Sequence, residues 1–217
     1  MSATLSTLRD RVERILADNS NVIWSTDDVD ESIRQALHEY SLVNPLAAIA
    51  TLTLSADGRE ISTSTLSGLL RVYEIWCDYD ASDPEYPANR RPFEHWRDQA
   101  KVYVTGEYEP QSGDVVRFFY TKLQTLSGLD SATSTTFPDE DETLLATGAA
   151  GFAATSRAVD LTEQVTLDRL TAQQVRAWGL AKLQEFRAGL KGVSRRLAAA
   201  GRSDVELGSL DKWDGGW

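Results

Sequence analysis

Two histidines and one cysteine are the side chains of this sequence best suited to proton transfer, metal binding or nucleophilic attack. His38 and His95 each lack a neighbour at the spacing that a metal site or a catalytic triad requires. Cys77 is the only cysteine, which excludes an internal disulfide and any multi-cysteine metal site. We therefore expect structural or surface histidines, a cysteine that acts as a small hydrophobe, and neither metal nor cofactor.

A cluster of carboxylates near residue 30 offers a second possible chemistry. Acid–base catalysis or calcium binding could use Asp27, Asp28, Asp30 and Glu31. The same residues begin a predicted helix, where carboxylates compensate the positive end of the helix dipole. The segment 148–151 is not a phosphate loop, because it is apolar and no Lys-Ser or Lys-Thr follows it. We predict no enzymatic activity; a hydrolase that depends on Asp28 is an alternative.

Aromatic side chains around the proline-rich segment 80–92 could line a carbohydrate platform. They are Trp76, Tyr79, Tyr86, Phe93 and Trp96. Core packing and subunit contact are the favoured roles, because aromatic residues dominate both kinds of buried surface. A carbohydrate- or receptor-binding module centred on Trp76 and Trp96 is the alternative function.

The composition is that of a globular protein with an acidic body. The 217 residues are 41% hydrophobic and 25% charged, and no apolar run approaches the roughly 20 residues that span a bilayer. No basic and apolar signal region stands at the beginning, so we expect synthesis in the cytoplasm and no membrane partner. The net charge of −11 argues against general nucleic-acid binding. Residues 167–202 hold eight Lys and Arg against two acids, which predicts charge complementarity within the chain or between copies.

Residues 1–46 are predicted to form a hairpin of two helices. Apolar residues recur at helical spacing from Leu5 to Leu16, and a short turn-forming segment follows. Ser25 and Asp28 form the signature of a helix start, and Asn44-Pro45 ends the second helix. Two amphipathic helices with a short connection are expected to pack against each other.

Residues 47–124 are predicted to form a small antiparallel β module of about five strands. Asp57-Gly58 is typical of a two-residue hairpin turn between the first two strands. The segment 69–79 is apolar on both faces, which favours a central strand. The segment 93–99 is interpreted as a helical turn, and strands are expected over 102–104 and 115–122.

The remaining residues are predicted to complete a helical bundle. Residues 125–138 are small and polar, as in an extended arm. Residues 139–202 should hold two helices, the second running from 167 to about 201, with a seam of Leu183, Phe186, Leu190, Val193 and Leu197. Gly179, Gly189 and Gly192 should mark tight helix contacts. Residues 203–217 form a tail. The fold class is α+β, a mainly helical bundle with an inserted β module.

Several segments taken together resemble a known family. They are L-x-x-L-R-x-x-V-E-x-x-L over 5–16, D-N-S-N-V-I-W-S-T-D-D-V-D-E-S-I-R-Q-A-L over 18–37, and T-T-F-P-D-E over 135–140. A proline-terminated helix, a β insertion, a polar arm and a long last helix accompany them. The pattern resembles the head-to-tail adaptor, or connector, proteins of tailed bacteriophages, and the likeness covers most of residues 4–200.

The resemblance implies a non-enzymatic virion protein of the neck, assembled in the host cytoplasm. It implies a ring of about twelve copies with the portal above, a tail or stopper protein below, and DNA passing through the lumen without sequence-specific contacts. It also implies portal docking by the tail, which we assign to Leu207, Leu210, Trp213 and Trp217. We expect Arg187, Lys191, Arg195 and Arg196 to meet acidic surfaces of neighbouring subunits. We further expect the arm 125–137 and the tail to find burial only in the assembly.

Overall fold

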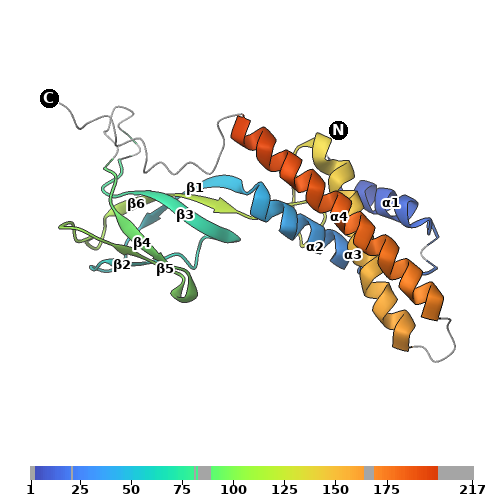
Figure 1. The fold of residues 1–217 in the computed structure, drawn as a ribbon. Coiled ribbons are helices and arrows are strands. Elements are labelled where there is room, and N and C mark those ends of the chain that lie inside the picture. The colour runs from blue at the N-terminus through green and yellow to red at the C-terminus, as the bar shows by residue number, and fades with distance from the viewer. Residues whose placement is uncertain (1–2, 21, 81, 83–88, 164–168, 200–217) are drawn as a thin grey trace. The chain divides into compact units, whose positions relative to one another are not determined.

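The computed structural model describes residues 3–20, 22–80, 82, 89–163 and 169–199. It divides into two compact units, one formed by the residues before Pro45 and after Leu123, the other by Pro45–Leu123. The first unit is helical and the second is built of strands, as Figure 1 shows. The α+β class and the insertion of a β module between helices are thus confirmed.

The helical unit contains four α-helices whose beginnings and buried faces follow the sequence pattern. They are α1 (Leu5–Leu16), α2 (Thr26–Val43), α3 (Glu142–Glu163) and α4 (Arg169–Ala199). The Ser25 hydroxyl accepts the Asp28 N–H and the Asp28 carboxylate accepts the Ser25 N–H, a capping box that starts α2 as predicted. Four of the five predicted seam residues of α4 are also buried, with Phe186 fully enclosed, and Leu197 is half-buried.

The segment between α1 and α2 is fixed by one buried carboxylate. Asp18 accepts the backbone N–H groups of Val22, Ile23 and Trp24 at 2.8–3.0 Å. These hydrogen bonds hold the pKa of Asp18 below its ordinary value, and the bond from the Trp24 N–H has the largest effect. Residues 22–24 are therefore held in place, with Val22 82% and Ile23 48% exposed.

The central helix of the unit is α3, on which the predicted hairpin of α1 and α2 packs. Both α1 and α2 make most of their contacts with α3 and few with each other. The reason lies in the sequence of α3, where every residue from Leu145 to Gly151 is buried, so that all sides of the helix are covered. A helix that is apolar all round takes the middle of a bundle.

Glycines set the close packing of α3 against α4. A Cβ added at Gly148 would lie 2.8 Å from the ring of Phe186, and one at Gly151 would lie 2.9 Å from Leu183. At Gly179 the nearest atom, in Thr155, would be 2.9 Å away. At Gly189 it would be 2.3 Å away, in Leu144. Tight contacts are therefore confirmed for Gly179 and Gly189, whereas the prediction for Gly192 is wrong, since nothing lies within 4 Å of its added Cβ.

The segment 125–137 is part of the helical core, which contradicts the expectation that only a neighbouring subunit would bury it. Leu126, Leu129 and Phe137 are at most 5% exposed. Thr136 N–H donates to Thr125 O, and Leu5 N–H donates to Ser127 O. Side-chain hydroxyl groups form hydrogen bonds with backbone groups that have no strand partner in this segment. The small polar residues therefore form an ordered loop rather than an extended arm.

The β unit consists of two three-stranded antiparallel sheets that enclose one core. One sheet has the order β1-β6-β3 and the other β2-β5-β4. The strands are β1 (Leu46–Thr53), β2 (Glu60–Ser62), β3 (Leu69–Trp76), β4 (Phe93–Trp96), β5 (Lys101–Val104) and β6 (Val115–Lys122). Val102, Val116, Phe118 and Ile75 are fully buried in this core, which both sheets supply. There are thus six strands in the described residues, not five.

Three local predictions in the β unit are corrected. Asp57-Gly58 closes no hairpin, because β1 pairs with β6 while β2 pairs with β5. The chain passes here between sheets, with Gly58 N–H bonded to Pro110 O. The strand β3 lies at an edge, and β6 is central. The segment 93–99 is the strand β4 followed by one 3₁₀ turn, Arg97–Gln99.

Replacing Gly148 by alanine should destabilise the helical unit by about 1–3 kcal/mol, because the added methyl group overlaps the Phe186 ring. Gly192→Ala is the matched control in α4. Because there is open space around Gly192, this substitution should stabilise the chain by roughly 0.5–1 kcal/mol through the higher helix propensity of alanine. Urea unfolding followed by circular dichroism gives both values. Equal effects of the two substitutions would contradict the close packing.

Candidate functional site

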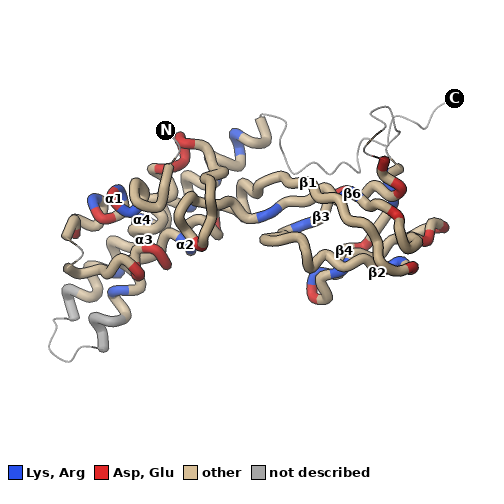
Figure 2. Tube along the Cα trace, turned by 180° about the vertical axis from the view of Figure 1, so that it is seen from behind, with Lys and Arg blue, Asp and Glu red and all other residues tan. Residues whose placement is uncertain are grey.

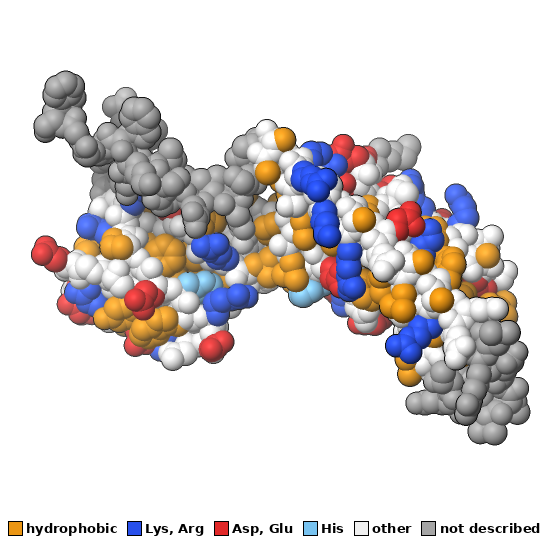
Figure 3. Space-filling model, viewed as in Figure 1, with side chains coloured by type: hydrophobic (Ala, Val, Ile, Leu, Met, Phe, Trp, Pro, Cys, Tyr) orange, Lys and Arg blue, Asp and Glu red, His pale blue; other side chains and the backbone are white. Residues whose placement is uncertain are grey.

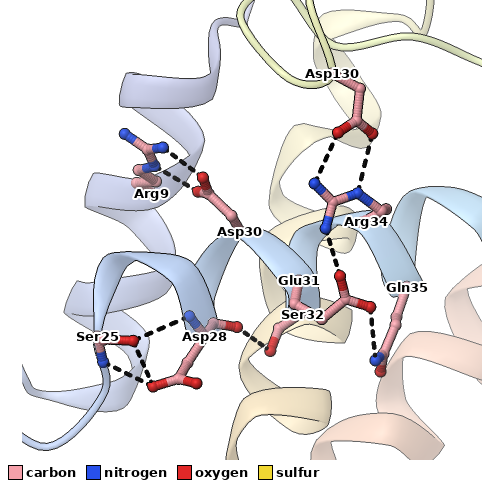
Figure 4. A network of polar contacts seen from close by, with 9 residues as sticks. All are labelled: Arg9, Ser25, Asp28, Asp30, Glu31, Ser32, Arg34, Gln35 and Asp130. Atoms are coloured by element: carbon pink, nitrogen blue, oxygen red, sulfur yellow. Dashed lines mark hydrogen bonds and ion pairs between the residues drawn. The ribbon is translucent and has the colours of Figure 1, made fainter.

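The acidic cluster near residue 30 belongs to a network of polar contacts within the chain (Figure 4). Asp30 pairs with Arg9 of α1, and Glu31 pairs with Arg34 of α2. Asp28 is held by the capping box, where hydrogen bonds from Ser25 lower the pKa of its carboxyl group. These three carboxylates already have partners, so the geometry favours the structural interpretation over calcium binding or acid–base catalysis.

Asp130 completes this network and was not singled out by the sequence. Its two carboxylate oxygens accept from Arg34 at 2.7 and 2.9 Å, across 96 residues of chain. The Arg34 guanidinium lowers the pKa of Asp130. The contact joins the loop before α3 to α2. In the sequence, only the charge of Asp130 indicated a role for this residue.

A buried carboxylate links α4 to α2. Asp141, 3% exposed, accepts the Tyr40 hydroxyl at 2.6 Å and the Arg196 guanidinium at 2.7 Å. The Asn44 amide donates to the same tyrosine oxygen at 2.7 Å. Burial raises the pKa of Tyr40 most, and the hydrogen bond to Asp141 raises it further. The hydroxyl group therefore stays protonated and acts as a donor. This arrangement is a satisfied polar network that fixes the end of α4.

Two of the four basic residues expected at a subunit contact have partners in their own chain. Arg196 meets Asp141 and also Glu140, and Arg187 meets Glu39 of α2 at 2.8 Å. Acidic residues stand at the beginning of α3 and basic ones in the last turns of α4 (Figure 2). Arg187 and Arg196 thus form ion pairs within one chain, and their contact with a neighbouring subunit stays a prediction.

Lys191 and Arg195 remain available for a partner. Both are exposed, and neither has an ion pair with any residue that the structure describes. Figure 3 shows Lys and Arg side chains in a row over α4. Complementarity within the chain therefore accounts for part of the basic helix. Lys191 and Arg195, like Arg176 of the same helix, are exposed and lack an ion pair among the described residues.

The histidines and the cysteine lie where proton or nucleophile chemistry is not supported. His38 is exposed at an open depression of about 400 Å³ between polar residues of α2 and Phe152. His95 is half-buried on β4, where burial, Arg97 and Arg71 lower its pKa. Cys77 is fully buried, which raises the pKa of its thiol to about 12 and confirms its role as a small hydrophobe.

The aromatic residues of the β unit separate into two groups on different sheets. Trp76 packs against Phe119 at 4.7 Å between centroids and against Tyr79 at 6.1 Å, with the Arg117 guanidinium over the same rings. Trp96 instead stacks on Tyr103 of β5, at 5.0 Å and 12°. Phe93 packs on the core, and Tyr86 lies outside the described residues.

An apolar depression of about 380 Å³ opens on the helical unit and was not foreseen from the sequence. Its walls include Ile15, Leu16, Trp24, Val175 and Trp178. Trp178 is 38% exposed, a considerable exposure for so large an apolar side chain. This surface is suited to protein contact rather than to catalysis.

Four residues assigned to portal docking, Leu207, Leu210, Trp213 and Trp217, lie outside the described residues. Within the described ranges, no three His, Cys, Asp or Glu side chains gather in a way that could hold a metal ion. None of the helices there is long and apolar enough to cross a membrane. No family model matches the chain, and no curated protein matches it either.

Removing the Arg196 side chain should cost about 1–2 kcal/mol of stability, because the buried Asp141 loses a charged partner. The cost is limited because the guanidinium group is half-exposed and makes a weaker ion pair than a buried one. The control is Lys191→Met, one and a half turns earlier on the same helix, which should change stability by less than about 0.5 kcal/mol. Urea unfolding of Arg196→Met and Lys191→Met measures the difference. A loss of equal size at Lys191 would contradict this assignment of the two residues.

Proposed function

We propose that this chain is a head-to-tail adaptor of a tailed bacteriophage. In this proposal, copies of the chain form a ring in the neck of the virion, between the portal and the tail. DNA passes through the lumen, and the segment 203–217 docks on the portal through Leu207, Leu210, Trp213 and Trp217. The protein is structural and carries out no reaction.

The observation that carries the proposal is the likeness of three sequence segments to adaptor proteins, together with where those segments lie. The segment 5–16 is α1 itself, 18–37 holds the Asp18 loop and most of α2, and 135–140 leads into α3. Each segment therefore contains caps, loop anchors or core residues of the helical unit. The β unit is inserted between α2 and α3, as the resemblance implies.

Exposed apolar and basic side chains give the proposed ring a means of assembly. Val22 and Ile23 project from a loop that Asp18 holds in place, and Trp178 lines the apolar depression. Because these residues are presented by ordered elements, little conformational entropy is lost when a neighbour covers them. Lys191 and Arg195 supply positive charge that an acidic neighbour can meet.

The charge of the chain is compatible with a DNA conduit. At −11, the protein repels the phosphate backbone, and a lumen with that potential lets DNA slide instead of binding it. The pairing of Arg187 and Arg196 with acids of the same chain reduces the number of unpaired cations that could hold DNA.

The alternative, a carbohydrate- or receptor-binding module, has one observation in its favour. Trp96 and Tyr103 are stacked on the outer side of the β2-β5-β4 sheet and are only half-buried, so a sugar ring could contact them. Trp76 is not beside them on that sheet, since it belongs to the Phe119 and Tyr79 group. The wide platform that this alternative needs is therefore not formed by these two tryptophans.

Negative-stain electron microscopy tests the proposal directly. Purified chain, alone and mixed with the portal of the same virus, should show rings with a central hole in at least the mixture. The reason is that a closed ring buries the exposed apolar residues of every copy. Single particles without rings in both samples, at micromolar concentration, would overturn the proposal.

Deleting residues 203–217 should leave the fold intact and abolish attachment to the portal. Circular dichroism and urea unfolding check the fold, and co-sedimentation with portal checks attachment. A double substitution of Trp213 and Trp217 by alanine should weaken attachment as well, because aromatic anchors carry most of the binding energy in such contacts. Unchanged co-sedimentation of the deletion variant would refute the docking role of the tail.

A further inference from the structure

The four edge strands of the β unit differ in how they are protected from pairing with another chain. Natural sheets guard their edges with charges, bulges, prolines or short strands. The edge strand β3 has two register shifts and carries Arg71 and Glu74. The edge strand β2 has three residues, and β4 has four, among them Glu94. Each of these three edges has at least one of the usual guards.

The fourth edge strand, β1, has none of them. Its eight residues, Leu-Ala-Ala-Ile-Ala-Thr-Leu-Thr, include no charge and no proline. Its register with β6 runs without a shift from the Leu46–Lys122 pair to the Thr53–Val115 pair. A long, regular and uncharged edge is the form that accepts a further strand.

The backbone groups that would accept a strand can be identified from the ladder. Leu54 N–H donates to Asp114 O at 2.9 Å, which continues the β1–β6 register and directs the even-numbered residues of β1 toward β6. The N–H and C=O groups of Ala47, Ile49, Thr51 and Thr53 therefore point to the free edge. None of these groups bonds to another described residue outside the ladder.

The side chains of β1 agree with an open flank. Ala48, Ala50 and Leu52 face the core of the β unit but are only half-buried, whereas Val116 and Phe118 on the central strand β6 are completely buried. On the outer face, Ile49 is 54% exposed. A strand added beside β1 would cover the flank of these residues and continue the sheet.

We propose that the free edge of β1 pairs with β1 of a second copy of this chain, antiparallel and about a two-fold axis. A second copy is the favoured occupant because β1 is the one unguarded edge among the described strands, so only β1 on β1 joins two unguarded edges. The strand carries no charge that would repel its duplicate. The register that uses all four free residues pairs Ala47 with Thr53 and Ile49 with Thr51 of the second copy, and places Ala50 at the axis.

Disulfide trapping tests this register. In Ala50→Cys, the two introduced thiols would face each other in a non-hydrogen-bonded pair, with Cα atoms about 4.5 Å apart, which suits a disulfide. Mild oxidation should give a covalent dimer as the main product. The native Cys77 will not compete, since it is fully buried. In the control Thr53→Cys, the two thiols would be roughly 20 Å apart and should stay unlinked.

The trap also separates this contact from the proposed ring. A ring that closes head to tail joins unlike surfaces, so it does not bring position 50 of one copy beside position 50 of another. Equal dimer yields from Ala50→Cys and Thr53→Cys, or no dimer from Ala50→Cys while the protein is folded, would overturn the two-fold pairing. Neither result would bear on whether rings form with the portal.

A second pair of variants tests the edge without cysteine. Thr51→Pro removes an N–H that points to the free edge and leaves every β1–β6 hydrogen bond in place. Sedimentation velocity over a concentration series should show dimerisation weakened roughly tenfold or more relative to wild type. Thr51→Val keeps the N–H and should dimerise like wild type. Equal dimerisation of both variants, or monomers alone in the wild-type series, would overturn the proposal.

Discussion

The close approach of α3 and α4 is the contact on which the helical unit depends. Gly148, Gly151, Gly179 and Gly189 leave no room for a Cβ, so the facing side chains of Phe186, Leu183, Thr155 and Leu144 fill the space between the helices. Glycine in a helix costs about 1 kcal/mol relative to alanine, and the dense packing along two long helices offsets that cost. With this pair in place, α3 presents alanine faces on which α1 and α2 pack.

Polar contacts across long stretches of chain then fix the elements around that pair. Asp141 joins Tyr40 and Arg196, Asp130 joins Arg34, and Asp18 holds the loop before α2. Each is a carboxylate with several donors, which makes it specific in geometry as well as stabilising. Their effect on function is indirect. They hold exposed apolar side chains on ordered backbone and pair arginines with acids of the same chain, which agrees with the adaptor role proposed above.

In the β unit, six short strands enclose one core as two separate sheets instead of a single continuous sheet. Crossing from one sheet to the other after β1 brings Val102 and Ile61 against Val116 and Phe118, and all four are buried. The arrangement leaves edges, and the sequence guards them unequally. An unguarded edge is a hazard in a protein that must stay single, but it is a natural contact in one that assembles.

The sequence by itself determined the features that depend on near neighbours in the chain. Caps and apolar spacing predicted α1, α2, α3 and α4, and alternation predicted most strands. Residues far apart in sequence decided the rest. Asp57-Gly58 is a good hairpin turn locally, but burying Ile61 against the other sheet governs where the chain goes next. The polar segment 125–137 lacks charge and periodicity, and three well-spaced apolar residues still anchor it in the core. The partners of Arg187 and Arg196 lie 148 and 55 residues away, because charges on different helices meet only when the tertiary structure brings those helices together.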